Sequence, residues 1–305
     1  MGRFLDWLTD RVQAESGEKE RRQLVQELKS AALVFKDTIE KAISQLNIVI
    51  EKFNAAIKSL NQHRQGKTKQ NIETLHSFLS KFGQCKDVGI FAPESQRLPD
   101  TFPQKKLDNI ENYIAGVDWS SDEVFMNTIF RTPLGMKLKT RKQNLSLRER
   151  LNELKLETEA TKRELELREY HTEQDIQICE LYSANVDWIA MCITRKVLPE
   201  LELIEAFFEA EALKDTIIAN GNVRSTHFVY DIKSIKDTRY DRHYQFIKNA
   251  FMFYVISCLI YNTPVLTRLL ANQATSEDAA RLLKEKELLE DQTAALDESM
   301  LLVRR

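Results

Sequence analysis

The sequence predicts an all-α protein, an elongated bundle of long antiparallel helices with coiled-coil-like packing and one thicker end. The 305 residues include only 8 Gly and 6 Pro, far below average usage, so few turns are expected. Apolar residues recur at alternating steps of three and four, which is the period of a helix packed along one face. Charged residues make up 30% of the chain, as in long solvated helices.

The clearest pattern is a heptad seam over Val25–Leu60, and none of its positions is polar. The seam consists of Val25, Leu28, Ala32, Phe35, Ile39, Ala42, Leu46, Val49, Phe53, Ala56 and Leu60. A parallel line of Ile43, Ile50 and Ile57 makes the apolar face wider than a two-stranded coiled coil needs. The seam is roughly 50 Å long and needs a partner of similar length. We expect that partner to be part of residues 136–219, with a second copy of the chain as the alternative.

Three segments follow one another along the chain. Residues 1–82 should hold a short amphipathic helix, the seam helix and a shorter third helix, with Gly66 in the turn between the last two. Residues 83–135 should form an irregular connector with short helices, and its first part, 83–103, is the longest irregular stretch. Residues 136–305 should hold a long charged helix and apolar C-terminal helices. We expect these to fold with residues 18–62 as one helical domain.

The first thirteen residues predict the short amphipathic helix. Its apolar face carries Phe4, Leu5, Leu8 and Val12. A helix that lies on a membrane surface usually has a cationic polar face. The polar face of this helix carries as many aspartates as arginines, so it has no net positive charge. We therefore expect the helix to dock onto the protein's own bundle. Ser16 and Gly17 then break the helical pattern.

Charge and cysteine content narrow the expected partners. The net charge of −2 gives no overall attraction to nucleic acid, so nucleic acid is not an expected partner. The 4 cysteines contain no C-x-x-C pair, which favours reduced thiols in the cytoplasm. We expect a cytoplasmic protein, with peripheral membrane association as an option, and neither a cofactor nor a metal.

The stretch Ala250–Tyr261 is apolar on all sides except at Ser257. A helix that is apolar all round is either buried or in lipid. Twelve residues span about 18 Å, against roughly 30 Å for the hydrocarbon core of a bilayer. We favour a central core helix, with a hydrophobic element that is released into a membrane as the alternative. The candidate core or membrane-contact residues are Phe251, Phe253, Tyr254, Val255, Ile256, Leu259 and Ile260.

The stretch Arg131–Arg150 carries the strongest local positive charge, with Glu149 as its single acid. Such a patch could bind phosphates of lipid or nucleic acid, but no aromatic residue interleaves with it, which argues against single-stranded nucleic acid. The alternative is a solvated face, or one that pairs with the acidic stretch Glu200–Glu211. The candidate residues for binding an anionic surface are Arg131, Lys137, Lys139, Arg141, Lys142 and Arg148.

Signals for catalysis are weak. Glu73 and His76 match half of a carboxylate-bridged di-iron pattern, but the chain lacks the other half. The cluster Asp237–His243 combines acids, bases and a phenol that could serve acid–base chemistry, although we favour a helix start with local salt bridges. Phosphate-binding glycine loops and nucleophile motifs are absent from the sequence. We expect a protein that is not an enzyme.

The expected function is therefore a non-enzymatic helical scaffold or protein-interaction module that self-associates. The alternative is a membrane-acting helical protein that binds, remodels or perforates membranes through residues 250–261 and the basic patch 131–150. The sequence leaves open the partner, the oligomeric state and the role of the 83–103 loop.

Overall fold

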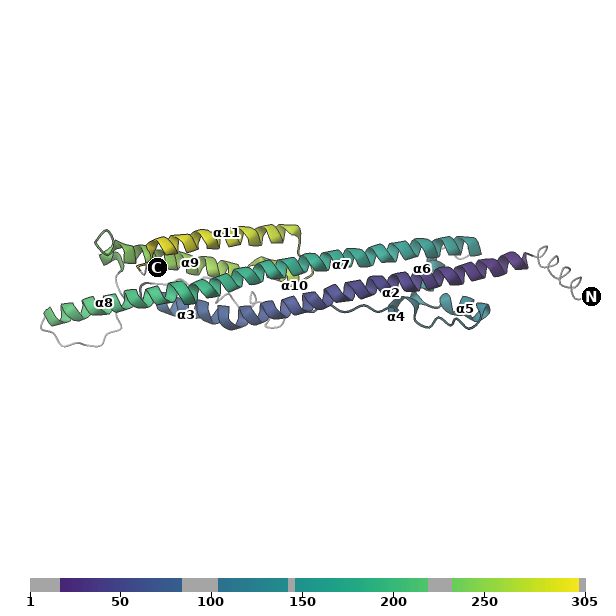
Figure 1. The fold of residues 1–305 in the computed structure, drawn as a ribbon, viewed down its shortest axis with the longest axis horizontal. Coiled ribbons are helices and arrows are strands. Elements are labelled where there is room, and N and C mark those ends of the chain that lie inside the picture. The colour runs from purple at the N-terminus through teal and green to yellow at the C-terminus, as the bar shows by residue number, and fades with distance from the viewer. Residues whose placement is uncertain (1–16, 84–103, 142–145, 219–231, 302–305) are drawn as a thin grey trace, which may run out of the picture. The chain divides into compact units, whose positions relative to one another are not determined.

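The computed structural model describes residues 17–83, 104–141, 146–218 and 232–301, and every regular element in these ranges is helical (Figure 1). The predicted all-α helical bundle is confirmed. The elements are α2 (Glu18–His63), η1 (Arg64–Thr68), α3 (Lys69–Leu79), α4 (Glu111–Ile114), α5 (Asp122–Ile129), α6 (Pro133–Arg141), α7 (Leu147–Cys192), η3 (Ile193–Val197), α8 (Leu198–Ile218), η4 (Ile232–Ile235), α9 (Asp241–Tyr261), α10 (Pro264–Leu270) and α11 (Ser276–Ser299).

The chain divides into two compact units. Unit 1 comprises Met1–Phe53 and Lys105–Glu173, and unit 2 comprises Asn54–Gln104 and Gln174–Arg305. The division falls inside α2 and inside α7, so both long helices contribute to both units. The three segments expected from the sequence divide the chain at other points, and each of them supplies residues to both units.

The predicted seam is the buried face of α2. Its positions are buried, apart from Ala42 and Ala56, which are partly exposed. The parallel line of Ile43, Ile50 and Ile57 is also buried. Steps of three and four keep these side chains on one face of the helix, as the sequence pattern indicated.

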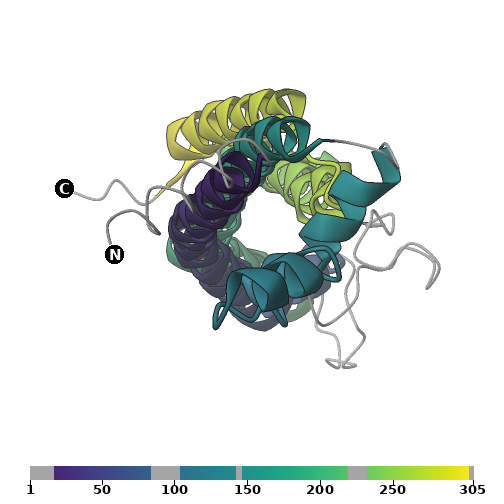
Figure 2. The ribbon, with the colours of Figure 1, turned by 90° about the vertical axis from the view of Figure 1, so that its right-hand side faces the viewer.

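In unit 1 the seam is covered by helices of the same chain. Its core cluster joins α2 to Phe125 and Ile129 of α5, Leu134 and Leu138 of α6, and Leu151, Leu154 and Leu165 of α7. Figure 2 looks along α2 (purple), and the teal helices of this unit lie above it, below it and on the opposite side of the view. The expectation of an intramolecular partner for the seam is therefore confirmed in this unit.

Helices α2 and α7 run parallel in unit 1, not antiparallel as expected. Near the start of both helices, Arg148 pairs with Glu20. Farther along both helices, Asp108 bonds to Asn47 of α2 and to Arg168 of α7. Consecutive long helices that run parallel need a long crossover connection, and residues 80–146 connect the two.

The same direction holds in unit 2. His63 bonds to Asp187, and Asn71 bonds to Thr194, with sequence separations of 124 and 123. Two neighbouring helices keep a constant sequence separation only when they are parallel. In contrast, α9 runs antiparallel to α11, because Asn249 bonds to Ala295 while Thr263 bonds to Glu285.

Two π-helical turns interrupt the long helices in unit 2. The turn η1 joins α2 to α3 and contains Gly66, so the helix continues where the sequence suggested a helix–helix turn. Buried Arg64 and Thr68 anchor η1, and Thr68 donates to the carbonyl oxygen of Val186 at 3.4 Å. The second turn, η3, joins α7 to α8 just before Pro199, where the missing backbone donor of proline permits a change of helical register.

Candidate functional site

The apolar run lies in α9, and its side chains divide between core and surface. Among the predicted residues, Phe253, Tyr254 and Ile260 are buried, and Phe251, Val255 and Ile256 are partly exposed. Leu259 is 61% exposed and Met252 is 48% exposed. The core interpretation therefore accounts for one side of α9 and leaves an apolar outer side.

Two neighbours hold α9 in place. Towards α3, the ring of Tyr254 lies 5.6 Å from the ring of His76. Towards α11, Asn249 donates from Nδ2 to the carbonyl oxygen of Ala295 at 2.9 Å, and Gln292 donates to the carbonyl oxygen of Asn249 at 2.9 Å. The orientation of α9 about its own axis is thus determined by specific contacts.

These contacts show which residues form the outer side of α9. Asn249 and Thr263 contact α11, and Met252 follows Asn249 by three residues, so it lies beside the α11-facing line. Leu259 follows Met252 by seven residues and shares its face. On α11, Leu288 is 54% exposed and lies one turn from the Thr263 contact. We call Met252, Val255, Leu259 and Leu288 the α9 strip.

One stretch of the described residues is long and apolar enough to cross a membrane by length and composition. It covers Asp241–Leu269, 29 residues, and 56% of its most apolar window is buried. Lys248 is the single charged residue between Tyr244 and Thr267. Core helices of soluble proteins can have the same properties.

A buried polar cluster closes the C-terminal end of α9. The hydroxyl of Tyr182 donates to the carbonyl oxygen of Tyr261 at 2.9 Å, and the Arg64 guanidinium lies 4.2 Å from the centre of the Tyr261 ring. Burial raises the pKa of Tyr182, so its hydroxyl keeps the proton that it donates. These groups satisfy a helix-terminal carbonyl where α9 ends before α10.

The described residues of the basic patch contact different parts of the protein and do not form one cluster of contacts. Lys137 lies 3.3 Å from the buried carboxylate of Glu157, and Arg148 pairs with Glu20. Arg131 is exposed at the end of α5. Lys142 lies outside the described residues, and nothing is described of the side chains of Lys139 and Arg141. The partners of Lys137 and Arg148 are thus acids of α7 and α2, not the stretch Glu200–Glu211.

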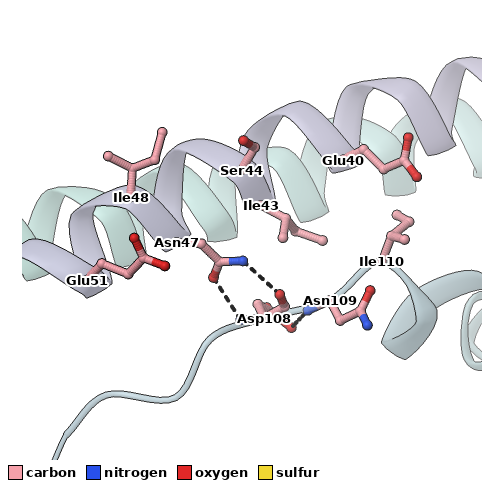
Figure 3. Close-up of a pocket in the computed structure, with 9 residues that line it drawn as sticks. All are labelled: Glu40, Ile43, Ser44, Asn47, Ile48, Glu51, Asp108, Asn109 and Ile110. Carbon is pink, nitrogen blue, oxygen red and sulfur yellow. Dashed lines mark hydrogen bonds between the residues drawn. The ribbon is translucent and has the colours of Figure 1, made fainter. Parts of the chain in front are cut away.

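Figure 3 shows a pocket of about 420 Å³ in unit 1, where residues 108–110 cross α2. Asn47 and Asp108 exchange two hydrogen bonds of 2.8 and 2.9 Å. The Asp108 carboxylate accepts from Arg168 at 2.7 Å and from the Tyr113 hydroxyl at 3.2 Å. Polar and acidic groups line the pocket, among them Glu40 and Glu51.

The electrostatics of this pocket favour a charged Asp108 and a neutral Tyr113, which together attach residues 108–113 to the helices beside them. Burial works to raise the pKa of Asp108, but hydrogen bonds from Asn112, Arg168 and the Asn109 backbone outweigh it and lower the pKa. Burial, then the charge of Asp108 and the hydrogen bond to it, raise the pKa of Tyr113 to about 12. The carboxylate stays charged and the phenol stays neutral, so the pair holds residues 108–113 in place.

The Asp237–His243 cluster has the contacts of a helix start. The backbone N–H of Asp237 donates to Asp241 at 2.9 Å, and this bond and one from Gln245 lower the pKa of Asp241. The ring of His243 packs 4.7 Å from that of Phe207. The cluster thus lies at the start of α9, and the contact of His243 with Phe207 connects that start to α8.

Glu73 and His76 lie on α3, where His76 packs on Tyr254. Within the described residues, no group of three or more His, Cys, Asp or Glu could hold a metal ion. Three cysteines, Cys179, Cys192 and Cys258, are buried thiols of the core. Burial raises the pKa of the Cys192 thiol, which keeps it in its unreactive form.

Comparison with known proteins gives no relative: no family model, no curated protein and no solved structure matches this chain.

Sequence reasoning did not single out Asp108, Arg64 or Tyr182. The adjacent Asp108 and Asn109 are typical of side chains that bond to nearby backbone, which could have marked the anchor. Arg64 lies in a run of polar residues, so nothing local indicated that it is only 3% exposed.

Proposed function

We propose that this protein is a non-enzymatic helical interaction module that associates with a second copy of itself through the α9 strip. The observation that carries the proposal is the outward position of Leu259 and Met252 on a helix whose other sides are already packed. Met252 and Leu259 lie on one face of α9 with the partly exposed Val255 between them, and apolar surface of this kind on a helical protein is typical of interaction sites. The α9 strip is not the α2 seam. The side chains of the seam are buried, so the seam is not the surface proposed for self-association.

Charge at the two ends of the strip favours a second copy as the occupant. Lys248 lies one turn before Met252, and exposed Glu287 lies beside Leu288. A twofold contact makes the same patch meet itself. If two copies of α9 cross antiparallel near Val255, Lys248 of one copy approaches the end of the strip that carries Glu287 in the other. Opposite charges then meet at both edges of an apolar centre.

Light scattering on the full chain over a range of concentrations tests self-association. We expect a dimer, and we expect Leu259→Glu to shift it to a monomer with an unchanged helical circular dichroism spectrum. Leu156→Glu is the matched control, because Leu156 is 68% exposed on α7 of unit 1 and should leave the dimer intact. A wild-type chain that stays monomeric at high concentration would overturn the proposal.

A charge swap adds a second test of the same contact. Lys248→Glu should weaken the dimer, and adding Glu287→Lys should restore it, because the two charges exchange places across the twofold axis. If the double variant is weaker than either single variant, the antiparallel arrangement is wrong.

Membrane action is the second candidate, and the length and composition of Asp241–Leu269 favour it. In that case Leu259 and Met252 would contact lipid. Flotation with anionic and neutral vesicles separates the two functions. Binding of the wild-type chain to vesicles that Leu259→Glu abolishes, together with a monomeric state in solution, would replace self-association with membrane binding. Absence of flotation would remove the membrane function.

A further inference from the structure

A second open surface lies in unit 1, at the start of α2. It is a pocket of about 710 Å³ between the first turns of α2, helix α5 and the start of α7. Its apolar lining comes from Val25, Met126 and Leu147, one residue from each of these helices. Pockets of this size accept several large side chains.

Charged groups of both signs surround this apolar lining. Asp122 and Glu123 lie in the first turn of α5, and Arg21 and Arg22 lie on α2, within 3.6 Å and 3.3 Å of Glu18. The acidic pair comes from α5 and the arginines of the lining come from α2 and α7, and Asp122 also pairs with Lys29 of α2 at 3.6 Å. A segment with an apolar face and an adjacent cation would match this pattern.

The pocket lies where the described chain begins. Glu18 is both the first residue of α2 and part of the pocket wall. Gly17 before it has φ of +70°, a left-handed conformation that glycine adopts without steric cost. Gly17 therefore connects residues 1–16 to α2 at the edge of this pocket, and its conformation permits a sharp change of direction.

We propose that residues 4–12 of the same chain occupy this pocket as an amphipathic helix. Its apolar face, with Leu5, Leu8 and Val12, packs on the apolar lining of the pocket. Arg11 follows Leu8 by three residues and lies at the edge of that face, where it meets Asp122 and Glu123. The inference does not rest on the proposed self-association, because the α9 strip belongs to the other unit.

The length of the chain permits this arrangement. Residues 13–17 can span up to about 16 Å when extended. Along α2, Val25 lies about 10 Å beyond Glu18. The helix can therefore fold back beside the first two turns of α2. The balanced charge of residues 1–13 also fits a protein surface better than an anionic membrane, which attracts cationic helices.

Hydrogen–deuterium exchange on the full chain tests the docking. Bound in the pocket, the amides of residues 4–12 should exchange about tenfold or more slowly than in an unstructured peptide. Leu8→Asp should remove this protection and speed exchange in residues 122–127 of α5. Because the core cluster of unit 1 is formed by residues from Leu28 to Leu165, this variant should leave the folding of α2 to α7 unchanged. Gln13→Asp, which adds the same charge outside the apolar face formed by Leu5, Leu8 and Val12, is the control and should retain the protection.

A charge swap checks the register. Arg11→Glu should weaken the protection of residues 4–12, and Glu123→Arg in the same chain should restore it. Three outcomes would overturn the proposal: exchange of residues 4–12 at the unstructured rate, protection that appears only as protein concentration rises, and protection that appears only with anionic vesicles. The second outcome would assign the pocket or the segment to another copy, and the third would assign the segment to a membrane.

Discussion

Asn47 and Asp108 are joined by a reciprocal pair of hydrogen bonds. Asn47 Nδ2 donates to the carbonyl oxygen of Asp108 at 2.9 Å, and the backbone N–H of Asp108 donates to Asn47 Oδ1 at 2.8 Å. The carboxylate of the same aspartate accepts from Arg168 at 2.7 Å. One residue of an irregular segment therefore ties α2 to α7 in unit 1.

Asn47→Ala should destabilise unit 1. The change removes both bonds and leaves two partly buried backbone groups of Asp108 without this partner, so we expect a loss of about 1–3 kcal/mol in the free energy of unfolding. Urea unfolding followed by circular dichroism measures it. Ser44→Ala, an exposed position in the same pocket, should change stability little, and equal effects of the two substitutions would contradict the anchoring role.

Tyr113→Phe should reduce the loss of stability at alkaline pH. The folded pKa of Tyr113 is raised from 10.0 to about 12, so the folded state holds the proton more tightly than the unfolded state does. Its contribution is complete below pH 10.0 and is lost as the pH rises through about 12. Unfolding midpoints on both sides of this window should fall less in Tyr113→Phe than in the wild type. Equal falls of the midpoint in the two proteins would contradict this contribution of Tyr113.

Tyr182→Phe should destabilise unit 2 by about 1–2 kcal/mol, because the Tyr261 carbonyl loses a buried donor while the packing of the ring is retained. Tyr170→Phe is the comparison on the same helix, since Tyr170 is 55% exposed. Thermal unfolding of the two variants measures the difference. If both variants unfold at the wild-type temperature, the hydrogen bond does not stabilise the end of α9.

Gly135→Ala and Gly66→Ala should have opposite effects. A Cβ at position 135 would overlap the carbonyl oxygen of Ile129 and the Cα of Phe130, so the start of α6 must move and stability should fall by about 1–3 kcal/mol. At position 66 nothing lies within 4 Å of the new methyl group. Alanine there should stabilise the helical turn by about 0.5–1 kcal/mol. Chemical unfolding of the two variants tests this contrast.

The seam residues show how much of the fold a local pattern can predict. The spacing from Val25 to Leu60 identified the buried face of α2 because burial on a helix depends on which side a residue occupies. The direction of the partner was a different matter. A heptad seam has the same pattern beside a parallel or an antiparallel neighbour, so the sequence did not reveal that α2 and α7 run parallel.

For the candidate sites too, the sequence predicted the local composition, and contacts between distant residues decided the rest. Composition identified α9 as an apolar helix, but the contacts of Asn249 with α11 decide that Leu259 faces outward and Phe253 inward. The number of positive charges in the basic patch followed from the sequence. The sequence did not show that Lys137 and Arg148 form ion pairs with acidic residues that lie elsewhere in the chain. Asp108 had a local turn signal only, since its partners Asn47 and Arg168 lie 61 and 60 residues away.

The sequence by itself determined the helical class and the face of α2 that is buried. These properties follow from side chains three and four residues apart, which lie together whenever the chain is helical. Only the tertiary structure decided the direction of α2 against α7, the continuation of the helix through Gly66 and the outer side of α9. These depend on contacts between residues far apart in the chain, for which local periodicity contains no information.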